Sequence, residues 1–242
     1  MCKTDGDGHH HANGDASLGH GARVRVDRGV LDKNDRLAEY NRGWLAGRRV
    51  LALNLVSSPG AGKTTLLERT VGVLAAEVPV SVVEGDQETD HDARRIRAAG
   101  CRAVQINTGV GCHLDAGLVG RALEELDPPL GSVVFIENVG NLVCPALFDL
   151  GEKAKVVVCS TPEGDDKPLK YPHMFRAARV VLLNKTDLLP HVPFDAARFA
   201  EAVRVVNPGV RVIPVSALHG DGLDEWYEWV REQAGRREPA AV

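Results

Sequence analysis

The chain has 242 residues, a formal net charge of -4 at pH 7 and 44% hydrophobic residues. This length is enough for one α/β domain with a buried core. The mild, mixed charge argues against a nucleic-acid partner held by phosphate contacts. The sequence has no apolar run of membrane-spanning length and does not begin with a signal peptide. We therefore expect a soluble, cytoplasmic protein without a membrane partner.

The cysteines are scattered along the chain, at Cys2, Cys101, Cys112, Cys144 and Cys159. An odd number of cysteines at irregular spacing argues against a disulfide framework. The remaining interpretations are that these cysteines are free thiols or metal ligands. Cys101 and Cys159 lie in or beside apolar segments, so we expect them to be ordinary core or surface thiols.

Residues 1–28 are rich in Gly, Asp and His and contain almost no large apolar side chain. Such a segment cannot bury enough surface to offset its ordering entropy, so we expect a disordered tail followed by one domain over residues 29–242. The tail carries four candidate nickel ligands, Cys2, His9, His10 and His11. Thiol and imidazole groups capture borderline metals, although a solvated tail without metal is an equal alternative.

The first elements after the tail are a helix and a strand. Apolar side chains recur at helical spacing over residues 32–45, which predicts an amphipathic helix leading into the domain. An apolar run over residues 50–56 then has the length of a buried strand, and it passes through a Pro/Gly loop into a helical pattern that begins near Lys63.

The loop between them reads S-S-P-G-A-G-K-T-T, with Ser57 in place of the first glycine of the usual phosphate-loop pattern. Its glycines let backbone N–H groups converge on phosphate oxygens at a helix start. Lys63 then reaches the β- and γ-phosphates, and the Thr64 hydroxyl holds Mg²⁺. An ordinary strand-turn-helix corner would need neither side chain. The expected phosphate-binding residues are Ser58, Gly60, Ala61, Gly62, Lys63, Thr64 and Thr65.

Short β-rich runs alternate with amphipathic helices along the rest of the chain. The strands are expected at residues 80–83, 103–106, 132–136, 155–158, 179–183 and 211–215, and the helices at 63–77, 91–99, 114–126, 194–206 and 223–233. This alternation predicts an α/β fold with a mainly parallel β-sheet flanked by helices, in which ligands gather at the carboxyl ends of the strands.

Asn184, Lys185 and Asp187 directly follow one of these strands in the sequence N-K-T-D. The Asp carboxylate accepts from guanine N1–H and the 2-amino group, which adenine lacks, so the motif predicts selection of GTP. Asn184 is expected to brace the loop, and the Lys185 stem to lie over the base. Ser216 and Ala217 end the last strand, where the Ala217 N–H is expected to donate to guanine O6.

Two further strand ends carry carboxylates. Asp86 lies just beyond one buried strand and Glu137 ends another. Hard carboxylate oxygens suit Mg²⁺, so we expect Asp86 and Glu137, with Lys63, to serve catalysis at the phosphates. Gly140 can bring its N–H to the γ-phosphate, so that loss of this phosphate releases the segment after it.

Cys112 and His113 open the helix expected after the third strand, and Cys144 follows Gly140 closely. Thiolate and imidazole hold Zn²⁺ or Ni²⁺, and the start of a helix favours a thiolate. Adjacent Cys and His residues are weak evidence by spacing alone, so buried structural cysteine remains an equal interpretation from these residues.

Five stretches together resemble the HypB family of hydrogenase nickel-incorporation GTPases. They are S-S-P-G-A-G-K-T-T, E-G-D-Q-x-T-D, I-N-T-G-x-G-C-H-L-D-A, E-N-V-G-N-L-V-C-P and N-K-T-D. The resemblance implies a P-loop fold of the signal-recognition/MinD-like (SIMIBI) class, and GTP hydrolysis coupled to nickel insertion into nickel–iron hydrogenase. It also implies a homodimer favoured by GTP, with the accessory protein HypA and the hydrogenase large subunit as partners. The family's interface site for Ni²⁺ or Zn²⁺ is carried over onto Cys112, His113 and Cys144.

The tail departs from the three-cysteine nickel motif of some members, because Asp5 and Asp7 stand where further thiols would lie. We therefore expect weak capture of nickel by the tail. Three other functions stay open at this stage: a urease-type nickel accessory GTPase, an ATP-dependent small-molecule kinase, and a nickel or zinc store with a regulatory nucleotide site. The urease proteins carry Cys-Pro-His where this chain has Cys144-Pro145-Ala146.

Overall fold

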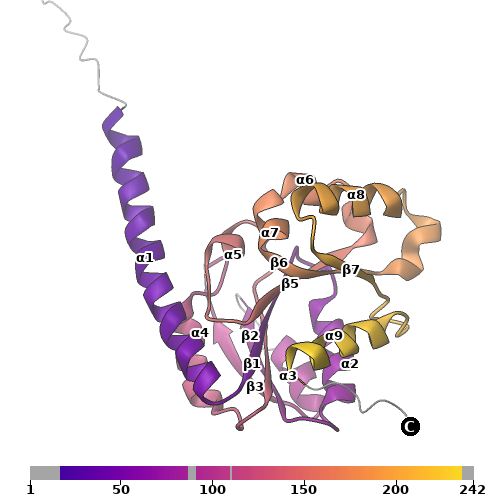
Figure 1. The fold of residues 1–242 in the computed structure, drawn as a ribbon, viewed down its shortest axis with the longest axis horizontal. Helices are drawn as coiled ribbons and strands as arrows, with labels where there is room; N and C mark the ends of the chain where they lie inside the picture. Colours follow the sequence, from indigo (N-terminus) through magenta and orange to yellow (C-terminus); the bar gives the residue numbers. More distant parts are fainter. Residues whose placement is uncertain (1–16, 87–90, 110, 236–242) are drawn as a thin grey trace, which may run out of the picture.

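A computed structural model describes residues 17–86, 91–109 and 111–235, with the backbone alone for residues 17–27, 91 and 92. Its centre is a seven-stranded sheet in the order β3-β2-β4-β1-β5-β6-β7, and every neighbouring pair is parallel (Figure 1). The strands are β1 Leu51–Ser57, β2 Val80–Asp86, β3 Arg102–Asn107, β4 Val133–Glu137, β5 Ala154–Ser160, β6 Ala178–Asn184 and β7 Arg211–Pro214. The predicted parallel α/β fold is confirmed.

Helices cover both faces of the sheet (Figure 1). The longer helices are α1 Ser17–Gly47, α2 Lys63–Leu74, α3 His91–Ala98, α4 Ala116–Leu126, α8 Ala196–Val206 and α9 Leu223–Gln233. Residues of α2, α3 and α9 pack into one apolar cluster with alternate strand positions, whereas α1 and α4 pack on the other face of β1, β2 and β4. The alternation of buried side chains along β1 fixes which positions face each layer.

The short elements were not predicted from the sequence. They are α5 Cys144–Leu147, α6 Lys167–Lys170, α7 Pro172–Ala177, and the 3-10 helices η1 Thr161–Glu163 and η2 Thr186–His191. Helices of three to six residues are too short to show helical periodicity, and α5, α6 and α7 each have a proline as the first or second residue. Apart from the first helix, the boundaries of the longer predicted elements agree with the observed ones to within a few residues.

The first helix is longer than predicted. α1 begins at Ser17 and therefore includes residues 17–28, which were expected to belong to a disordered tail. Extending an existing helix adds one hydrogen bond for each residue fixed, and so costs less than starting one. The remaining tail, with Cys2, His9, His10 and His11, lies outside the described residues. Within the described ranges, neither α1 nor any other helix combines the length and apolarity needed to cross a bilayer.

The loop between α5 and β5 lies directly against α1 at Gly151. This glycine has φ +89°, and an added Cβ would lie 2.6 Å from the Ala38 carbonyl oxygen and 2.7 Å from Asn41 Cβ. Both contacts are closer than a real Cβ tolerates, and the contacting atoms belong to the helix. The close approach of this loop to α1 therefore requires glycine.

Gly151→Ala should lower the free energy of unfolding by about 2 kcal/mol or more, because left-handed strain of about 1–2 kcal/mol adds to the overlap with α1. Urea denaturation followed by circular dichroism measures this change. The matched control is Gly43→Ala on α1, where nothing lies within 4 Å of the new Cβ. That variant should gain about 0.5–1 kcal/mol from helix propensity. Equal stability of the two variants would contradict the argument.

Candidate functional site

The predicted phosphate loop joins β1 to α2. Gly62 lies immediately before α2 with φ +96°, where an added Cβ would be 2.5 Å from Asn184 Nδ2. Lys63 Nζ donates to Ser57 Oγ at 2.7 Å. The serine that replaces the usual first glycine therefore contacts the lysine expected to bind phosphate. The first residues of α2 line an open cavity, and the start of a helix suits an anionic ligand.

That cavity has a volume of about 400 Å³. It is lined by residues from several strand ends, namely Pro59, Gly60, Gly62, Lys63, Thr64, Thr65, Glu84, Gly85, Asp86, Arg95, Cys112, Glu137, Asn138, Val139, Gly140 and Asn141. The sequence motifs identified only part of this set. Glu84, Arg95, Asn138 and Asn141 were missed as lining residues, although both asparagines belong to the quoted E-N-V-G-N stretch.

Oxygen donors meet at one end of the cavity. Thr64 Oγ1 donates to Glu137 Oε1 at 2.8 Å, because β4 pairs with β1 and places Glu137 opposite Leu55. Asp86 ends the neighbouring strand β2 and lines the same cavity. A hydroxyl and two carboxylates are hard ligands of the kind that Mg²⁺ takes, so the predicted magnesium ligands fit such an ion.

A second cavity, of about 310 Å³, lies beside the first and shares Thr65 with it. Its other lining residues are Asn184, Lys185, Asp187, Leu188, Ala217 and Leu218. Ser216 Oγ donates to Asp187 Oδ1 at 2.6 Å, and this hydrogen bond lowers the pKa of Asp187, which keeps the carboxylate ionised. The N-K-T-D and S-A-L stretches therefore meet, as the sequence predicted.

Asn184 braces these loops through both ends of its amide. Its Nδ2 donates to the Ala61 carbonyl at 2.8 Å, and its Oδ1 accepts from Ala217 N at 2.9 Å. The Ala217 N–H, which was predicted to donate to guanine O6, thus has Asn184 Oδ1 as an acceptor within the protein. If guanine O6 also accepts from the Ala217 N–H, this donor would be shared between O6 and Asn184 Oδ1. Lys185 Nζ donates to the Gly60 carbonyl at 2.7 Å, which lays its stem along the cavity.

Cys112, His113 and Cys144 come together at the edge of the first cavity. Their candidate ligand atoms all lie within 4.8 Å of one another. Cys112 Sγ is 3.2 Å from Cys144 Sγ and 3.5 Å from His113 Nδ1. Burial raises the pKa of Cys144, with a further contribution from its hydrogen bond to Cys112, and burial lowers the pKa of His113. The imidazole is thus biased toward the neutral form that binds metals, and two thiols and one imidazole suit Ni²⁺ or Zn²⁺.

The prediction that Cys112 lies at a helix start was wrong. Helix α4 begins at Ala116, and its N-cap is Asp115, whose carboxylate accepts from Leu118 N at 2.8 Å. Cys112 therefore lies in the loop before the helix and not at its first turn. The helix dipole does not act on this thiol, because its effect is confined to the first turn. Cys101 and Cys159 are both buried, as expected for core thiols.

Comparisons with known proteins agree with this geometry. Residues 51–214 match the family model "CobW/HypB/UreG, nucleotide-binding domain". Hydrogenase maturation factor HypB from Azotobacter vinelandii is 57% identical over 219 residues, covering 90% of this chain and 72% of that protein. The chain belongs to the HypB family. The membership also places it among the SIMIBI-class P-loop proteins and favours the hydrogenase assignment over the alternatives left open by the sequence.

Solved HypB structures share the fold over most of the chain. HypB from Archaeoglobus fulgidus has a TM-score of 0.78 at 37% identity, covering 84% of this chain and 99% of that one. HypB from Helicobacter pylori, solved in complex with nickel, has a TM-score of 0.79 at 34% identity, covering 86% and 100%.

Cys144→Ala should remove about one bound Ni²⁺ per chain, because a site of three ligands loses one of its two sulfurs. Metal analysis after equilibrium dialysis measures the loss. Cys159→Ala is the matched control, since that thiol is buried elsewhere in the core. Equal nickel content in Cys144→Ala and the unchanged chain would contradict the assignment of the cluster.

Proposed function

We propose that the chain is a GTP-hydrolysing nickel metallochaperone that helps insert nickel into nickel–iron hydrogenase during its maturation. The observation that carries the proposal is that Cys112 lines the same cavity as Lys63, Thr64 and Glu137. One cavity thus holds both the residues suited to a triphosphate and a thiol of the metal cluster. Membership of the HypB family supports the same function.

Guanine selection rests on Asp187. Its carboxylate lines the second cavity and is held by Ser216 Oγ, so it is oriented as an acceptor. Guanine offers two donors to such a carboxylate, whereas adenine offers none at these positions, so an ATP-bound site would leave the carboxylate without a hydrogen bond from the base. Lys185 and Asn184 shape the rest of the base pocket.

Asp187→Asn should weaken GTP binding by about 10- to 100-fold, because a charge-assisted hydrogen bond contributes about 1.5–3 kcal/mol. Binding of xanthosine triphosphate should improve, since the new amide can donate to the xanthine 2-oxygen. Competition against a fluorescent GTP analogue measures both affinities. Asp166→Asn, directly before α6, is the control. An Asp187→Asn protein that still prefers GTP would contradict guanine recognition by this side chain.

Hydrolysis at the first cavity would use Lys63, Asp86 and Glu137. Lys63 would neutralise charge on the β- and γ-phosphates. Thr64, Asp86 and Glu137 would hold Mg²⁺, which would supply further positive charge there. The backbone N–H groups from Gly60 onward orient the phosphates, together with Ser58, Ala61, Gly62 and Thr65. Positioning and charge stabilisation of this kind account for most of the catalysis of phosphoryl transfer.

The segment from Glu137 to Cys144 would couple nucleotide to nickel. Its first residue accepts from Thr64 at the phosphate end. Further along, Asn141 Nδ2 donates to the Cys112 carbonyl at 3.2 Å, and Cys144 Sγ lies 3.2 Å from Cys112 Sγ. Gly140, between them, lines the cavity, where its N–H would meet the γ-phosphate. Loss of that phosphate would therefore release a segment that carries one metal ligand and contacts another.

The resemblance to the family also implies partners. We propose a homodimer favoured by GTP, with the metal cluster at its interface, that works in the cytoplasm with the accessory protein HypA and the hydrogenase large subunit. The position of the cluster supports an interface role, because Cys112, His113 and Cys144 are all partly exposed and exposed Val143 and Leu147 flank Cys144.

Nickel affinity should differ by at least about fivefold between the GDP-bound protein and the protein with a non-hydrolysable GTP analogue, since coupling energies are commonly 1–3 kcal/mol. Nickel titration with each nucleotide measures the difference, and sizing of the same samples should give a dimer with the analogue. Lys63→Ala is the control, because its nickel affinity should not respond to nucleotide. Identical nickel affinities in both nucleotide states would contradict the coupling.

A further inference from the structure

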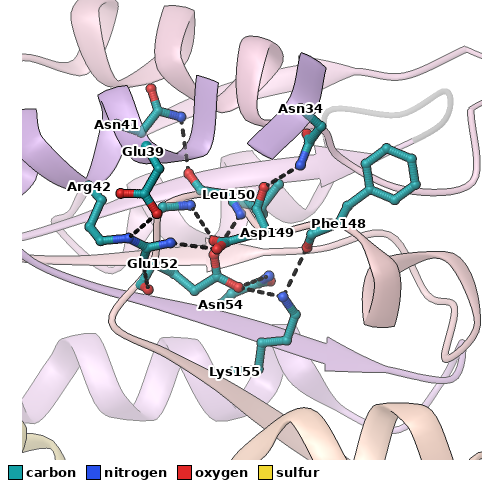
Figure 2. Close-up of polar contacts among 11 residues, drawn as sticks. Asn34, Glu39, Asn41, Arg42, Asn54, Phe148, Asp149, Leu150, Glu152 and Lys155 are labelled. Atoms are coloured by element: carbon teal, nitrogen blue, oxygen red, sulfur yellow. Dashed lines mark hydrogen bonds and ion pairs between the residues drawn. The ribbon is translucent and has the colours of Figure 1, made fainter. Parts of the chain in front are cut away.

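The cluster of Cys112, His113 and Cys144 is built from two separate chain segments. Cys112 and His113 precede α4, which begins at Ala116, and Cys144 begins α5, which is followed by the loop at residues 148–153. The spacing of the three ligands therefore depends on what holds these two segments at a fixed separation. Figure 2 shows that loop and the face of α1 that lies on it.

Asn34, on α1, forms hydrogen bonds to both segments. Its Nδ2 donates to the Asp149 carbonyl at 2.7 Å, and its Oδ1 accepts from Ala116 N at 2.9 Å. The side chain is almost fully buried, with a relative exposure of 4%. One amide thus joins the loop after Cys144 to the start of the helix after His113.

Asn41 repeats this arrangement two turns further along the same face of α1. Its Nδ2 donates to the Leu150 carbonyl at 3.0 Å and to the Ala116 carbonyl at 2.8 Å. It is buried to the same degree, with 3% exposure. Residues seven apart lie on one face of a helix, so two amides of α1 clamp the same pair of segments.

The clamped loop is rigid on its other side as well. Glu152 Oε2 accepts from Leu150 N at 2.7 Å, and Glu152 Oε1 accepts from Asn54 Nδ2 and from Lys155 Nζ. Lys155 Nζ also donates to the Phe148 carbonyl at 2.9 Å. Gly151 allows the loop to lie directly on the backbone of α1. A buried network of this kind, with each member paired, fixes a single arrangement.

Phe148 connects the loop held by Asn34 and Asn41 to the metal cluster. The ring centroids of Phe148 and His113 are 4.0 Å apart, and their planes are tilted by 39°. Phe148 lies four residues after Cys144 and directly before Asp149. The residue that packs on His113 therefore lies, along the chain, between the ligand Cys144 and the loop that Asn34 and Asn41 hold. A displacement of the loop relative to Ala116 would change both the packing of the His113 ring and the distance between the two sulfurs.

We propose that Asn34 and Asn41 are positioning residues of the nickel site, which hold its two ligand-bearing segments together through α1 without touching the ion. The proposal rests on the metal site of the proposed function. It assigns to α1 a part in metal binding, in addition to its packing on α4. Residues behind the ligands commonly change metal affinity by 10–100-fold when they are removed.

The test uses Asn34→Ala and Asn41→Ala in the whole 242-residue chain. Each should weaken Ni²⁺ binding about tenfold and shift the thiolate-to-nickel charge-transfer absorption, together with the ligand-field spectrum of the Co²⁺-loaded protein. A merely structural role would leave these spectra unchanged. If an alanine variant does not fold, Asn34→Ser carries the test, because its small, neutral hydroxyl cannot bridge Ala116 N and the Asp149 carbonyl as the amide does.

Two further variants separate the possible results. Leu45→Ala removes a buried apolar side chain of α1 that makes none of these hydrogen bonds, so it should lower stability with unchanged spectra and nickel affinity. Cys144→Ala defines the signal of the cluster itself. If Cys144→Ala binds nickel like the unchanged chain, the proposed metal site fails. The positioning role is overturned if Cys144→Ala loses the nickel spectrum while the folded asparagine variants keep both their spectra and their nickel affinity. It is also overturned if Leu45→Ala changes the spectra and the nickel affinity as much as the asparagine variants do.

Discussion

The parallel pairing of β1 with β4 is the constraint on which the sites depend. This register places Glu137 opposite Leu55, two residues before the phosphate loop begins at Ser57. The chain leaving β4 must then pass along the phosphate cavity before it reaches Cys144. A shift in register would separate the carboxylate from Thr64 and carry the thiol away from Cys112, so a single strand pairing brings nucleotide chemistry and metal chemistry into one cavity.

The fold and much of the site followed from local sequence patterns. Buried parallel strands appear as continuous apolar runs, and their carboxyl ends gather on one edge, so Asp86, Glu137 and Asn184 could be placed together from the sequence alone. The phosphate loop and the guanine motif are contiguous and carry their own chemistry. Cys112, His113 and Cys144 required the family resemblance, because the spacing of two segments does not reveal that their side chains meet.

Other features could not be predicted because they depend on contacts between distant residues. Asn34 and Asn41 appear in the sequence as ordinary polar positions of a helix, and only the structure places them beside Asp149, Leu150 and Ala116. The engagement of the Ala217 N–H by Asn184 likewise depends on two loops meeting. The position of Cys112 before α4 was misjudged because Asp115, an effective cap, starts the helix at Ala116, two residues later than the predicted start at residue 114.

The shared cavity has an electrical consequence. Loading a divalent ion onto two thiols releases two protons, so the cluster has the same net charge before and after it takes up its cargo. A triphosphate in the same cavity would therefore sense little change in potential when the ion arrives or leaves. Communication between the two ligands must then travel as displacement of the backbone from Glu137 to Cys144, and adding salt, which screens charges but does not bend a chain, should leave it largely intact.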